Sequence, residues 1–429
     1  MKYAIVGTGS RHVMYRDALV EHTTDPSTEL VALCDSNPAR LALSASRLPE
    51  GSGTSVGLYD AGEFDRMIAE RRPDTIIVTT PDYLHDVYVV QALRAGCDVI
   101  TEKPMTIDLG RLKGIVDAQL ETGRSVTVTF NYRYNPAHTQ LKDILMSGGV
   151  GEITAVDFRW YLDRVHGADY FRRWHRRKDQ SGGLLVHKAT HHFDLVNWWI
   201  ASRPETVTAL GARRFYVEST AESLGLGGHG ERCHGCPKSA ACPYRLDLDD
   251  DPELKSLYLD AEGADGYFRD RCVFSSEITI EDTMQVQVGY GNGVSMNYTL
   301  CAYSPWEGYE IVFYGTAGEL NHRHVGVHGT FGGTRHHADD SATTTVLHRH
   351  GEEPKQIEVW SGEGDHGGGD PVMLEELLNP AAGSDPYRRR ASHVDGAWSI
   401  LTGIAANASM ELGQTVTIAG LLHEAGIRL

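Results

Sequence analysis

The sequence predicts an α/β protein, with an N-terminal Rossmann domain (a doubly wound parallel sheet) followed by a C-terminal α+β domain that has an open, mainly antiparallel sheet. In the first 130 residues, short apolar segments alternate with segments of helical period, which is typical of a parallel sheet covered by helices. After residue 130, alternating apolar and polar residues between glycine-containing turns favour antiparallel strands. The 429 residues suffice for two domains, expected at 1–130 and 131–429.

The strands of the first domain are expected in apolar segments of about six residues, and its helices where apolar residues recur every three or four positions. Gly96 and Gly123 follow two of these helices, where a left-handed residue commonly ends a helix. The expected strands are Tyr3–Val6, Leu30–Cys34, Thr75–Thr79, Asp98–Thr101 and Ser125–Phe130. The helical pattern is carried by Phe64, Met67 and Ile68, and then by Leu109, Leu112, Ile115 and Val116.

The turn after the first strand contains Gly7 and Gly9, which have the spacing of a dinucleotide-binding fingerprint, although His12 replaces the third glycine. The first glycine permits a tight turn, and the second lets the backbone approach a pyrophosphate. Asp35 ends the second expected strand, where a carboxylate accepts hydrogen bonds from a ribose diol and repels a 2′-phosphate. The pattern therefore favours NAD over NADP. The alternatives are an ordinary strand–helix turn, and Asp35 as the N-cap of a helix near Pro38.

Two further motifs stand at the C-terminal ends of expected strands, where doubly wound folds bind ligands. One is Thr79–His85, and the other is Thr101–Pro104, which contains Lys103. The Lys103 ammonium could stabilise a developing alkoxide beside a nicotinamide, or shuttle a proton if nearby positive charge lowers its pKa. A solvated surface pair of Glu102 and Lys103 is the alternative.

The second domain is expected to begin with a helix at Pro136–Met146 and to continue with period-two strands. A basic run, Arg172–Lys178, could meet an acidic sugar, a phosphate or the cofactor, or could form a solvated face. Gly182–Trp199 is expected to be a loop that enters a helix, and Gly362–Gly369 a loop that could border the active site. The expected strands include Glu152–Trp160, Met284–Val288, Val294–Leu300 and Tyr309–Tyr314.

These motifs resemble those of the Gfo/Idh/MocA family of NAD(P)-dependent sugar and polyol oxidoreductases, over most of the chain. The resemblance implies hydride transfer at a secondary alcohol and a C-terminal sheet that often serves in oligomer contacts, so we expect a homo-oligomer (dimer or tetramer) formed through that sheet. The matching motifs are Gly7-x-Gly9, Asp35, Thr80-Pro81-x-x-x-His85, Glu102-Lys103-Pro104, Gly182-Gly183, His191-x-x-Asp194 and Ser399–Gly403. The implied cofactor contacts are Gly7, Gly9, Ser10, Arg11, Asp35, Thr80, Pro81, His85, Glu102 and Lys103.

The resemblance also implies two catalytic residues, Lys103 and His191. His191 matches the general base that takes the substrate's hydroxyl proton, a role that suits imidazole because its ordinary pKa is about 6.5. Four residues earlier, where many sugar dehydrogenases of the family carry an aspartate, this chain has His187, followed by Lys188. The polarity of the pocket is therefore changed, which leaves the charge of the substrate open. His187, Lys188, His191 and Arg133 are the candidates for substrate contact.

A cysteine-rich insertion is expected at about residues 225–275. Its four cysteines are separated by two, five and 29 residues. A Cys-x-x-Cys turn folds around one metal ion, and two further thiolates complete a tetrahedron, so structural Zn²⁺ is predicted. An iron–sulfur cluster takes the same ligands, and free thiols or one disulfide are further alternatives. A subset of the family carries a similar insertion. The predicted ligands are Cys233, Cys236, Cys242 and Cys272.

The charge balance and the lack of long apolar segments argue against nucleic acid and membranes as the main partners. The chain has 40 Lys and Arg against 58 Asp and Glu, a formal charge of −18, which argues against nucleic acid or an anionic membrane as the main partner. No apolar run approaches the roughly 20 residues of a membrane span, and no signal peptide is recognised, so we expect a cytoplasmic protein with reduced cysteines.

The sequence thus predicts an NAD-dependent oxidoreductase that transfers hydride between a secondary alcohol of a sugar, polyol or glycoside and the nicotinamide. One alternative is a redox-neutral glycoside hydrolase or lyase that oxidises its substrate transiently and then restores the hydride. The other is a protein that senses dinucleotides or sugars without catalysis. The presence of both Lys103 and His191 argues against the sensor.

Overall fold

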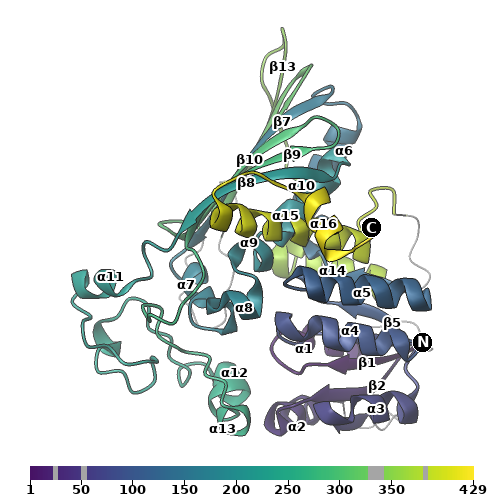
Figure 1. The fold of residues 1–429 in the computed structure, drawn as a ribbon, viewed down its shortest axis with the longest axis vertical. Helices are drawn as coiled ribbons and strands as arrows, with labels where there is room; N and C mark the ends of the chain where they lie inside the picture. Colours follow the sequence, from purple (N-terminus) through teal and green to yellow (C-terminus); the bar gives the residue numbers. More distant parts are fainter. Residues whose placement is uncertain (23–27, 50–55, 327–342, 380–384) are drawn as a thin grey trace.

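A seven-stranded sheet forms the core of the N-terminal domain in the computed structural model, which describes residues 1–22, 28–49, 56–326, 343–379 and 385–429 (Figure 1). The strand order is β15-β6-β5-β4-β1-β2-β3, in which β1 to β6 are parallel and β15 is antiparallel to β6. This is the predicted doubly wound order, with a topological switch between β1 and β4. The strands are β1 (Lys2–Val6), β2 (Glu29–Asp35), β3 (Gly57–Asp60), β4 (Thr75–Val78), β5 (Asp98–Thr101), β6 (Val126–Val128) and β15 (Ala391–Ser392).

Helices cover both faces of this sheet, which is why β4 is buried along its whole length. Asn37 caps the N-terminus of α2, and Gly123 ends α5 in the left-handed conformation, with φ of 66°, as predicted. The loops that follow β1, β4 and β5 all leave the same edge of the sheet, where a ligand is expected. The helices are α1 (His12–Asp17), α2 (Pro38–Ser46), α3 (Phe64–Arg71), α4 (His85–Arg94) and α5 (Leu109–Thr122).

Two strand predictions for this domain need correction. The last strand, expected at Ser125–Phe130, is limited to β6, because the chain turns there and the Phe130 amide bonds to the Val128 carbonyl. The short edge strand β3 was not predicted, since its four residues are too few for their alternation of buried and exposed positions to be recognised.

The second sheet has nine strands in the order β14-β13-β12-β11-β7-β10-β9-β8-β16. Every neighbouring pair is antiparallel except β7 and β10, so the prediction of a mainly antiparallel sheet is confirmed. The strands are β7 (Ile153–Asp163), β8 (Pro204–Ala212), β9 (Thr283–Tyr290), β10 (Ser295–Ser304), β11 (Gly308–Gly315), β12 (Gly318–Val325), β13 (Thr344–Arg349), β14 (Lys355–Ile357) and β16 (Val416–Thr417).

Helices cover only one face of the second sheet. In β9, Met284, Val286 and Val288 are buried, whereas Gln285 and Gln287 between them are exposed. The predicted oligomer contact through this sheet stays a prediction. No helix in the described part of the chain is long and apolar enough to cross a membrane. The helices of this domain are α6 (Pro136–Met146), α7 (His166–Tyr170), α8 (Lys178–Ser181), α9 (Leu184–His187), α10 (Thr190–Ile200), α14 (Asp365–Leu378), α15 (His393–Leu412) and α16 (Ile418–Ala425).

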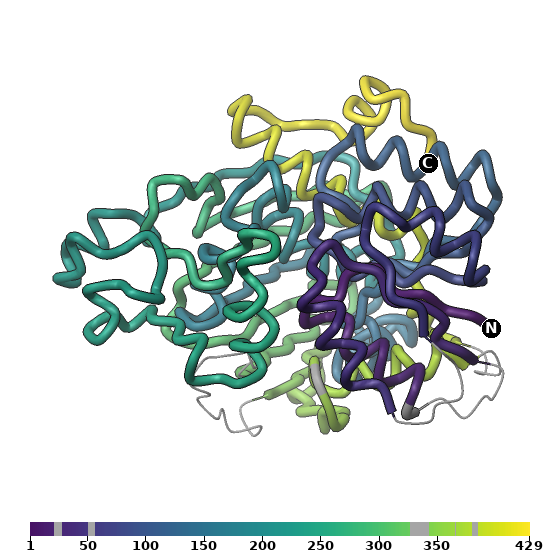
Figure 2. The backbone as a smooth tube through the Cα atoms, turned by 90° about the horizontal axis from the view of Figure 1, so that it is seen from below, coloured from purple at the N-terminus to yellow at the C-terminus, as the bar shows by residue number. Residues whose placement is uncertain are grey.

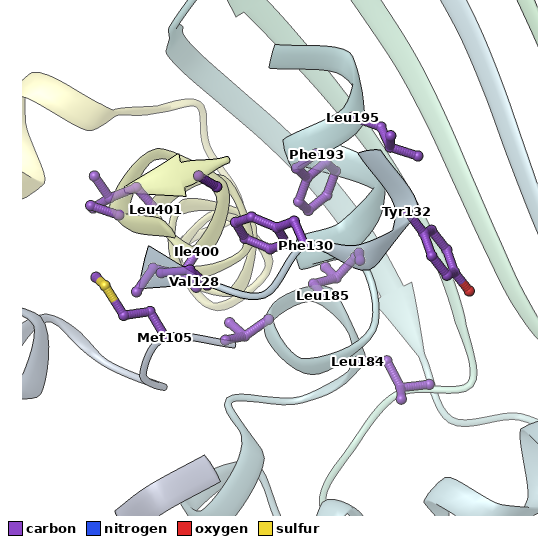
Figure 3. Close-up of a cluster of buried hydrophobic side chains, with 14 of the residues drawn as sticks. Met105, Val128, Phe130, Tyr132, Leu184, Leu185, Phe193, Leu195, Ile400 and Leu401 are labelled. Atoms are coloured by element: carbon purple, nitrogen blue, oxygen red, sulfur yellow. The ribbon is translucent and has the colours of Figure 1, made fainter. Parts of the chain in front are cut away.

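The two domains share a continuous apolar core at their junction. Figure 3 shows Val128 and Phe130, at the end of β6, beside Phe193 of α10 and Ile400 of α15, and all four side chains are buried. On the other face of the Rossmann sheet, apolar residues of α14 join the buried cluster that contains Tyr3 and Ile5 of β1. Late segments of the chain therefore complete the first domain and fix the end of β6.

A long excursion leaves the second sheet between the adjacent strands β8 and β9. It spans residues 213–282, which is wider than the predicted 225–275, and contains α11 (Glu218–Ser223), α12 (Pro252–Leu254) and α13 (Glu262–Asp265). It does not stay beside its own sheet: α12 and α13 lie next to the Rossmann domain, as Figures 1 and 2 show from two directions.

Candidate functional site

A cavity of about 500 Å³ lies at the C-terminal edge of the parallel sheet and is lined by both domains and by the excursion. Its wall brings together all the predicted site residues of the Rossmann domain and three of those in the second domain. The predicted residues that line it are Gly7, Gly9, Ser10, Arg11, Asp35, Thr80, Pro81, His85, Glu102, Lys103, His187, Lys188 and His191.

The glycine turn has the geometry that a dinucleotide site needs. A Cβ atom at Gly7, where φ is +92°, would lie 2.7 Å from backbone atoms of Thr79 and Thr80, so only glycine fits between β1 and β4. A Cβ atom at Gly9 would meet no atom within 4 Å, because this residue faces the cavity. His12, in place of the third glycine, is buried, and its Nε2 lies 2.6 Å from Ser44 Oγ.

Asp35 stands at the end of β2, in the cavity wall beside this turn. Its carboxylate accepts hydrogen bonds from the backbone amide and hydroxyl of Thr8, and from the Asn37 amide at 2.7 Å. Asn37, not Asp35, caps α2, so the N-cap alternative for Asp35 is wrong. The open space at Gly9 and the adjacent carboxylate fit the pyrophosphate and the ribose diol of NAD.

His85 holds together the loops that follow β4 and β5. One ring nitrogen lies 2.7 Å from the Pro104 carbonyl oxygen, and the other lies 2.8 Å from the Thr80 carbonyl oxygen. The Lys103–Pro104 peptide bond is cis. His85 was predicted to contact the cofactor; it lines the cavity, but both ring nitrogens are used to position the loops.

Arg11, predicted only as a cofactor contact, also forms ion pairs with two buried carboxylates. Its guanidinium bonds to Glu102 Oε1 at 2.6 Å and to Asp370 of α14 at 3.0 Å. Tyr15 also donates to Glu102, at 2.8 Å, and Asn131 donates to Asp370 at 2.6 Å. Burial alone would raise the pKa of Glu102, but the Arg11 guanidinium holds this pKa below its usual range. This network joins the glycine turn to the loop that carries Lys103.

Lys103 and His191 both line the cavity, and the pKa values of both side chains are lowered there. Burial lowers the pKa of Lys103, and the positive charges of Arg11 and Arg173 act in the same direction against Asp82 and Glu102. His191 is only 3% exposed, and burial and the charge of Lys103 lower its pKa well below 6.5. His191 is therefore a neutral base at neutral pH, and its ring stacks on Tyr132 with centroids 4.2 Å apart.

His187 is paired with a carboxylate that the sequence did not single out. Its Nδ1 bonds to a carboxylate oxygen of Asp82, from the loop after β4. Burial raises the pKa of Asp82 to about 7, and burial with the charge of Lys103 lowers the pKa of His187. The second ring nitrogen of His187 has no hydrogen-bond partner among the described residues, and the ring lines the cavity. An imidazole held at Nδ1 by a carboxylate is a recurrent arrangement for proton transfer.

Asp82, His175 and His187 also form the one group of three metal-ligating side chains in the described ranges whose ligand atoms lie within 4.8 Å of one another. Two histidines and a carboxylate can bind a divalent ion. However, burial lowers the pKa values of both histidines, and the positive charges of Lys103 and Arg173 act in the same direction. The same two charges oppose the binding of a metal cation. We therefore interpret this group as one that holds a proton.

Lys188 is a buried amine in the cavity wall. Its Nζ donates to the Tyr132 hydroxyl at 3.1 Å and lies 5.0 Å from the centre of the Trp160 ring. Burial, with the charge of Lys103, lowers the pKa of Lys188 to about 7. Lys188, which was predicted to contact the substrate, can therefore donate or accept a proton near neutral pH.

Arg133 does not line the cavity, which speaks against the predicted substrate contact. It is 3% exposed and makes a bidentate ion pair with Asp194, with N–O distances of 2.7 and 2.6 Å, and a further bond to Asp395 at 3.2 Å. The aspartate of the His-x-x-Asp motif therefore holds the start of the second domain to α10. From the basic run, Arg173 does reach the cavity, whereas Arg177 is half exposed at the surface.

The four predicted metal ligands gather around a second, much smaller cavity, within the excursion. The backbone amides of Gly230 and Leu246 lie 3.2 and 3.4 Å from the sulfurs of Cys236 and Cys233, as hydrogen bonds to thiolates do. No three of the four sulfurs, all within the described chain, lie within 4.8 Å of one another. A tetrahedral zinc ion, with Zn–S bonds of about 2.3 Å, needs them about 3.8 Å apart.

Several residues of the site could not be found from local motifs. His366, from the segment Gly362–Gly369 that was expected to be a loop at the border of the site, does line the cavity. The second half of this segment belongs to α14 and not to a loop, although the backbone of His366, Gly367 and Gly368 is not helical. The others come from the excursion and from positions that carry no pattern of their own. The unpredicted lining residues include Asp82, Tyr132, His166, Asp169, Tyr170, Tyr258, Tyr267 and Arg269.

A matched pair of glycine variants tests the cofactor site. We expect Gly9→Ala to keep the melting temperature of the protein but to weaken NAD binding, because the added methyl group enters the cavity. Gly7→Ala should lower the melting temperature, because its methyl group would collide with the backbone after β4. Calorimetric unfolding and NAD titration of both proteins check this, and unchanged NAD affinity in Gly9→Ala would contradict the assignment.

Comparison with known proteins agrees with this geometry. The NAD-binding Rossmann fold of the Gfo/Idh/MocA oxidoreductase family matches residues 1–130, and the C-terminal alpha/beta domain of that family matches residues 142–418. The Bacillus subtilis (strain 168) oxidoreductase YteT is 37% identical over 393 residues, 87% of this chain and 88% of its own. The Escherichia coli (strain K12) D-glucoside 3-dehydrogenase is 26% identical over 229 residues, 52% of this chain and 60% of its own.

Solved structures show the same fold at lower identity. The WlbA dehydrogenase of Bordetella pertussis, in complex with NADH and UDP-GlcNAcA, is 18% identical with a TM-score of 0.65, and 97% of each chain is covered. The aldose-aldose oxidoreductase of Caulobacter crescentus, complexed with glycerol, is 17% identical with a TM-score of 0.63, covering 97% of this chain and 99% of the other. This chain belongs to the Gfo/Idh/MocA family of oxidoreductases.

Proposed function

We propose that the protein is an NAD-dependent oxidoreductase that acts on a secondary alcohol of a sugar, polyol or glycoside. The observation that carries this proposal is that Lys103 and His191 line the same cavity as the Gly7–Gly9 turn and Asp35. When bound there, NAD would accept a hydride from the carbon that bears the alcohol. Relatives named as dehydrogenases of inositol and of D-glucosides support the substrate class.

The side chains divide the work by their charge states. His191, neutral because burial lowers its pKa, takes the proton of the substrate hydroxyl. Lys103 donates a hydrogen bond to the same oxygen as negative charge develops on it. Glu102 holds the backbone of this lysine, through the Lys103 amide at 3.2 Å. Tyr132 stacks on the His191 imidazole and accepts a hydrogen bond from Lys188 at 3.1 Å, so these two side chains hold the base in its orientation.

A second candidate, a redox-neutral glycoside hydrolase or lyase, is favoured by the pair of Asp82 and His187. Oxidation of a sugar carbon acidifies the neighbouring C–H bond, so a base can remove that proton while the aglycone leaves as the anion. His187 could serve as this second base, with Asp82 holding its other nitrogen. The elimination leaves an α,β-unsaturated ketone, and the departing aglycone anion takes up a proton. In a hydrolase water would add across the new double bond, whereas in a lyase the double bond would remain. The carbonyl carbon would then regain the hydride, with no net change in NAD.

One assay separates these functions. Purified protein with excess NAD is offered inositols, free sugars, sugar acids and glycosides, while nicotinamide absorbance and released aglycone are measured together. NADH that accumulates on one class establishes the dehydrogenase, and aglycone release without net NADH establishes the redox-neutral enzyme. With the active substrate, Lys103→Met should keep NAD binding but lower kcat by about 10²- to 10³-fold. Saturable binding with no turnover on any substrate, or an unchanged kcat in Lys103→Met, would contradict the proposal.

The pH dependence follows from the environment of His191. Because burial and the charges of Lys103 and Lys188 lower its pKa well below 6.5, kcat/KM should hold as pH falls through 6.5 and decline only below it. Lys188→Met removes one positive charge beside the imidazole, so the pKa of His191 rises and the acid limb should move to higher pH. Profiles of kcat/KM from about pH 5 to 9 for both proteins measure this shift, and a limb that stays or moves down would be inconsistent with His191 as the base.

We further propose that the four cysteines of the excursion bind one metal ion, with zinc expected. Their thiols surround one small cavity, and backbone amides already point at two of the sulfurs, so a modest inward movement of the sulfurs would complete the site. Elemental analysis should find one zinc per chain, and none in Cys236→Ser. Iron with visible absorption would instead indicate an iron–sulfur cluster, and the absence of both metals would overturn the assignment.

A further inference from the structure

The excursion carries its own apolar cluster to the Rossmann domain. Leu254, Leu257 and Tyr258 are buried together there, and Leu43 of α2 packs against them. This contact joins two segments more than 200 residues apart, on the side of the sheet where Asp35 ends β2. The excursion is therefore docked on the domain that binds the cofactor.

Polar contacts join the excursion to α2 at three residues: the N-cap, one residue inside the helix and the C-cap. Asn37 Nδ2 donates to the Ala261 carbonyl oxygen at 2.9 Å, and this bond is buried. Arg47 makes a bidentate pair with Glu253, with N–O distances of 2.6 and 2.8 Å, and Arg40 pairs with Asp265. The excursion is anchored here through α12, through α13 and through the N-cap of α13.

The same segment is fastened to the second domain across the cavity. Arg269 forms a buried ion pair with Asp169 at 2.6 Å. Between these anchors, Tyr258 donates to Ser10 Oγ in the glycine turn at 3.2 Å, and Tyr258, Tyr267 and Arg269 line the cavity. The excursion thus spans from one domain to the other over the cavity that contains Gly9.

We propose that the excursion, residues 213–282, is a wall of the cofactor site that retains the nicotinamide dinucleotide on the protein between catalytic cycles. This rests on the proposed function, since it assumes that NAD binds at Gly9 and Asp35. A dinucleotide held there would lie against Tyr258 and its neighbours, so the contacts of the excursion to α2 would restrain its release. The rate of dinucleotide release would then be set by the local opening of the excursion, which is slower than escape from an open cleft.

The direct test is the cofactor content of the purified protein. The protein is prepared without added NAD and dialysed extensively, then denatured, and the released NAD and NADH are quantified by chromatography. We expect close to one dinucleotide per chain, and slow exchange against an excess of isotopically labelled NAD followed by mass spectrometry. Release within the dead time of manual mixing would overturn the proposal.

A charge reversal at one anchor tests whether the excursion is responsible. Glu253→Lys turns the pair with Arg47 into a repulsion, and Glu253 is not itself a lining residue of the cavity, so release should become faster by about tenfold. Glu277→Lys makes the same change of charge at a residue of the excursion that is 66% exposed and makes only long ion-pair contacts of 3.8 and 4.0 Å; it should leave the exchange rate unchanged.

Two failures can be told apart. If Glu253→Lys releases the cofactor as slowly as the unaltered protein, the excursion does not retain it, although the proposed function stands. If the protein binds no NAD at millimolar concentration in a calorimetric titration, the proposed function fails, and the retention falls with it.

Discussion

The buried carboxylate of Glu102 is the interaction on which the site depends most. One oxygen accepts hydrogen bonds from Arg11 of the glycine turn and from Tyr15 of α1, and the other accepts from the Lys103 amide. Arg11 continues to Asp370, which belongs to a helix more than 350 residues later in the chain. A carboxylate without these partners would be an unpaired buried charge, so the network holds only if both domains are in place. The position of Lys103 therefore depends on contacts from both domains.

The electrostatics of the cavity follow from that placement. Burial lowers the pKa values of His187 and His191, and the positive charges of Lys103 and Lys188 act in the same direction, so both imidazoles are neutral at neutral pH. A neutral imidazole beside a lysine can take a proton from an alcohol while the lysine stabilises the oxygen left behind. The exchange of the family's usual aspartate for His187 does not remove the carboxylate from the pocket, because Asp82 supplies one from the other domain.

Local patterns predicted the parts of this protein that depend on local physics. The glycine turn, the capping by Gly123 and the alternating strands such as β9 each follow from backbone conformation or from which side chains are buried. The short strand β3 has too few residues for a period to be visible. Asp82, Asp370 and the wall formed by the excursion escaped prediction because their roles arise from contacts between segments far apart in the sequence. Arg133 shows the converse, since a position near the cleft was read as a substrate contact although its charge is needed to neutralise Asp194.

In the proposed reaction, a carbon-bound hydrogen moves directly from a sugar or polyol to the nicotinamide, while Lys103 stabilises the oxygen and His191 takes its proton. The most direct measurement uses the substrate found active, deuterated at each candidate carbon in turn, with mass spectrometry of the cofactor after a single turnover. One position of the label should appear on the nicotinamide, and the transfer should be lost in Lys103→Met. Conversion of the substrate with all the deuterium retained in the sugar, or released to water, would contradict this account.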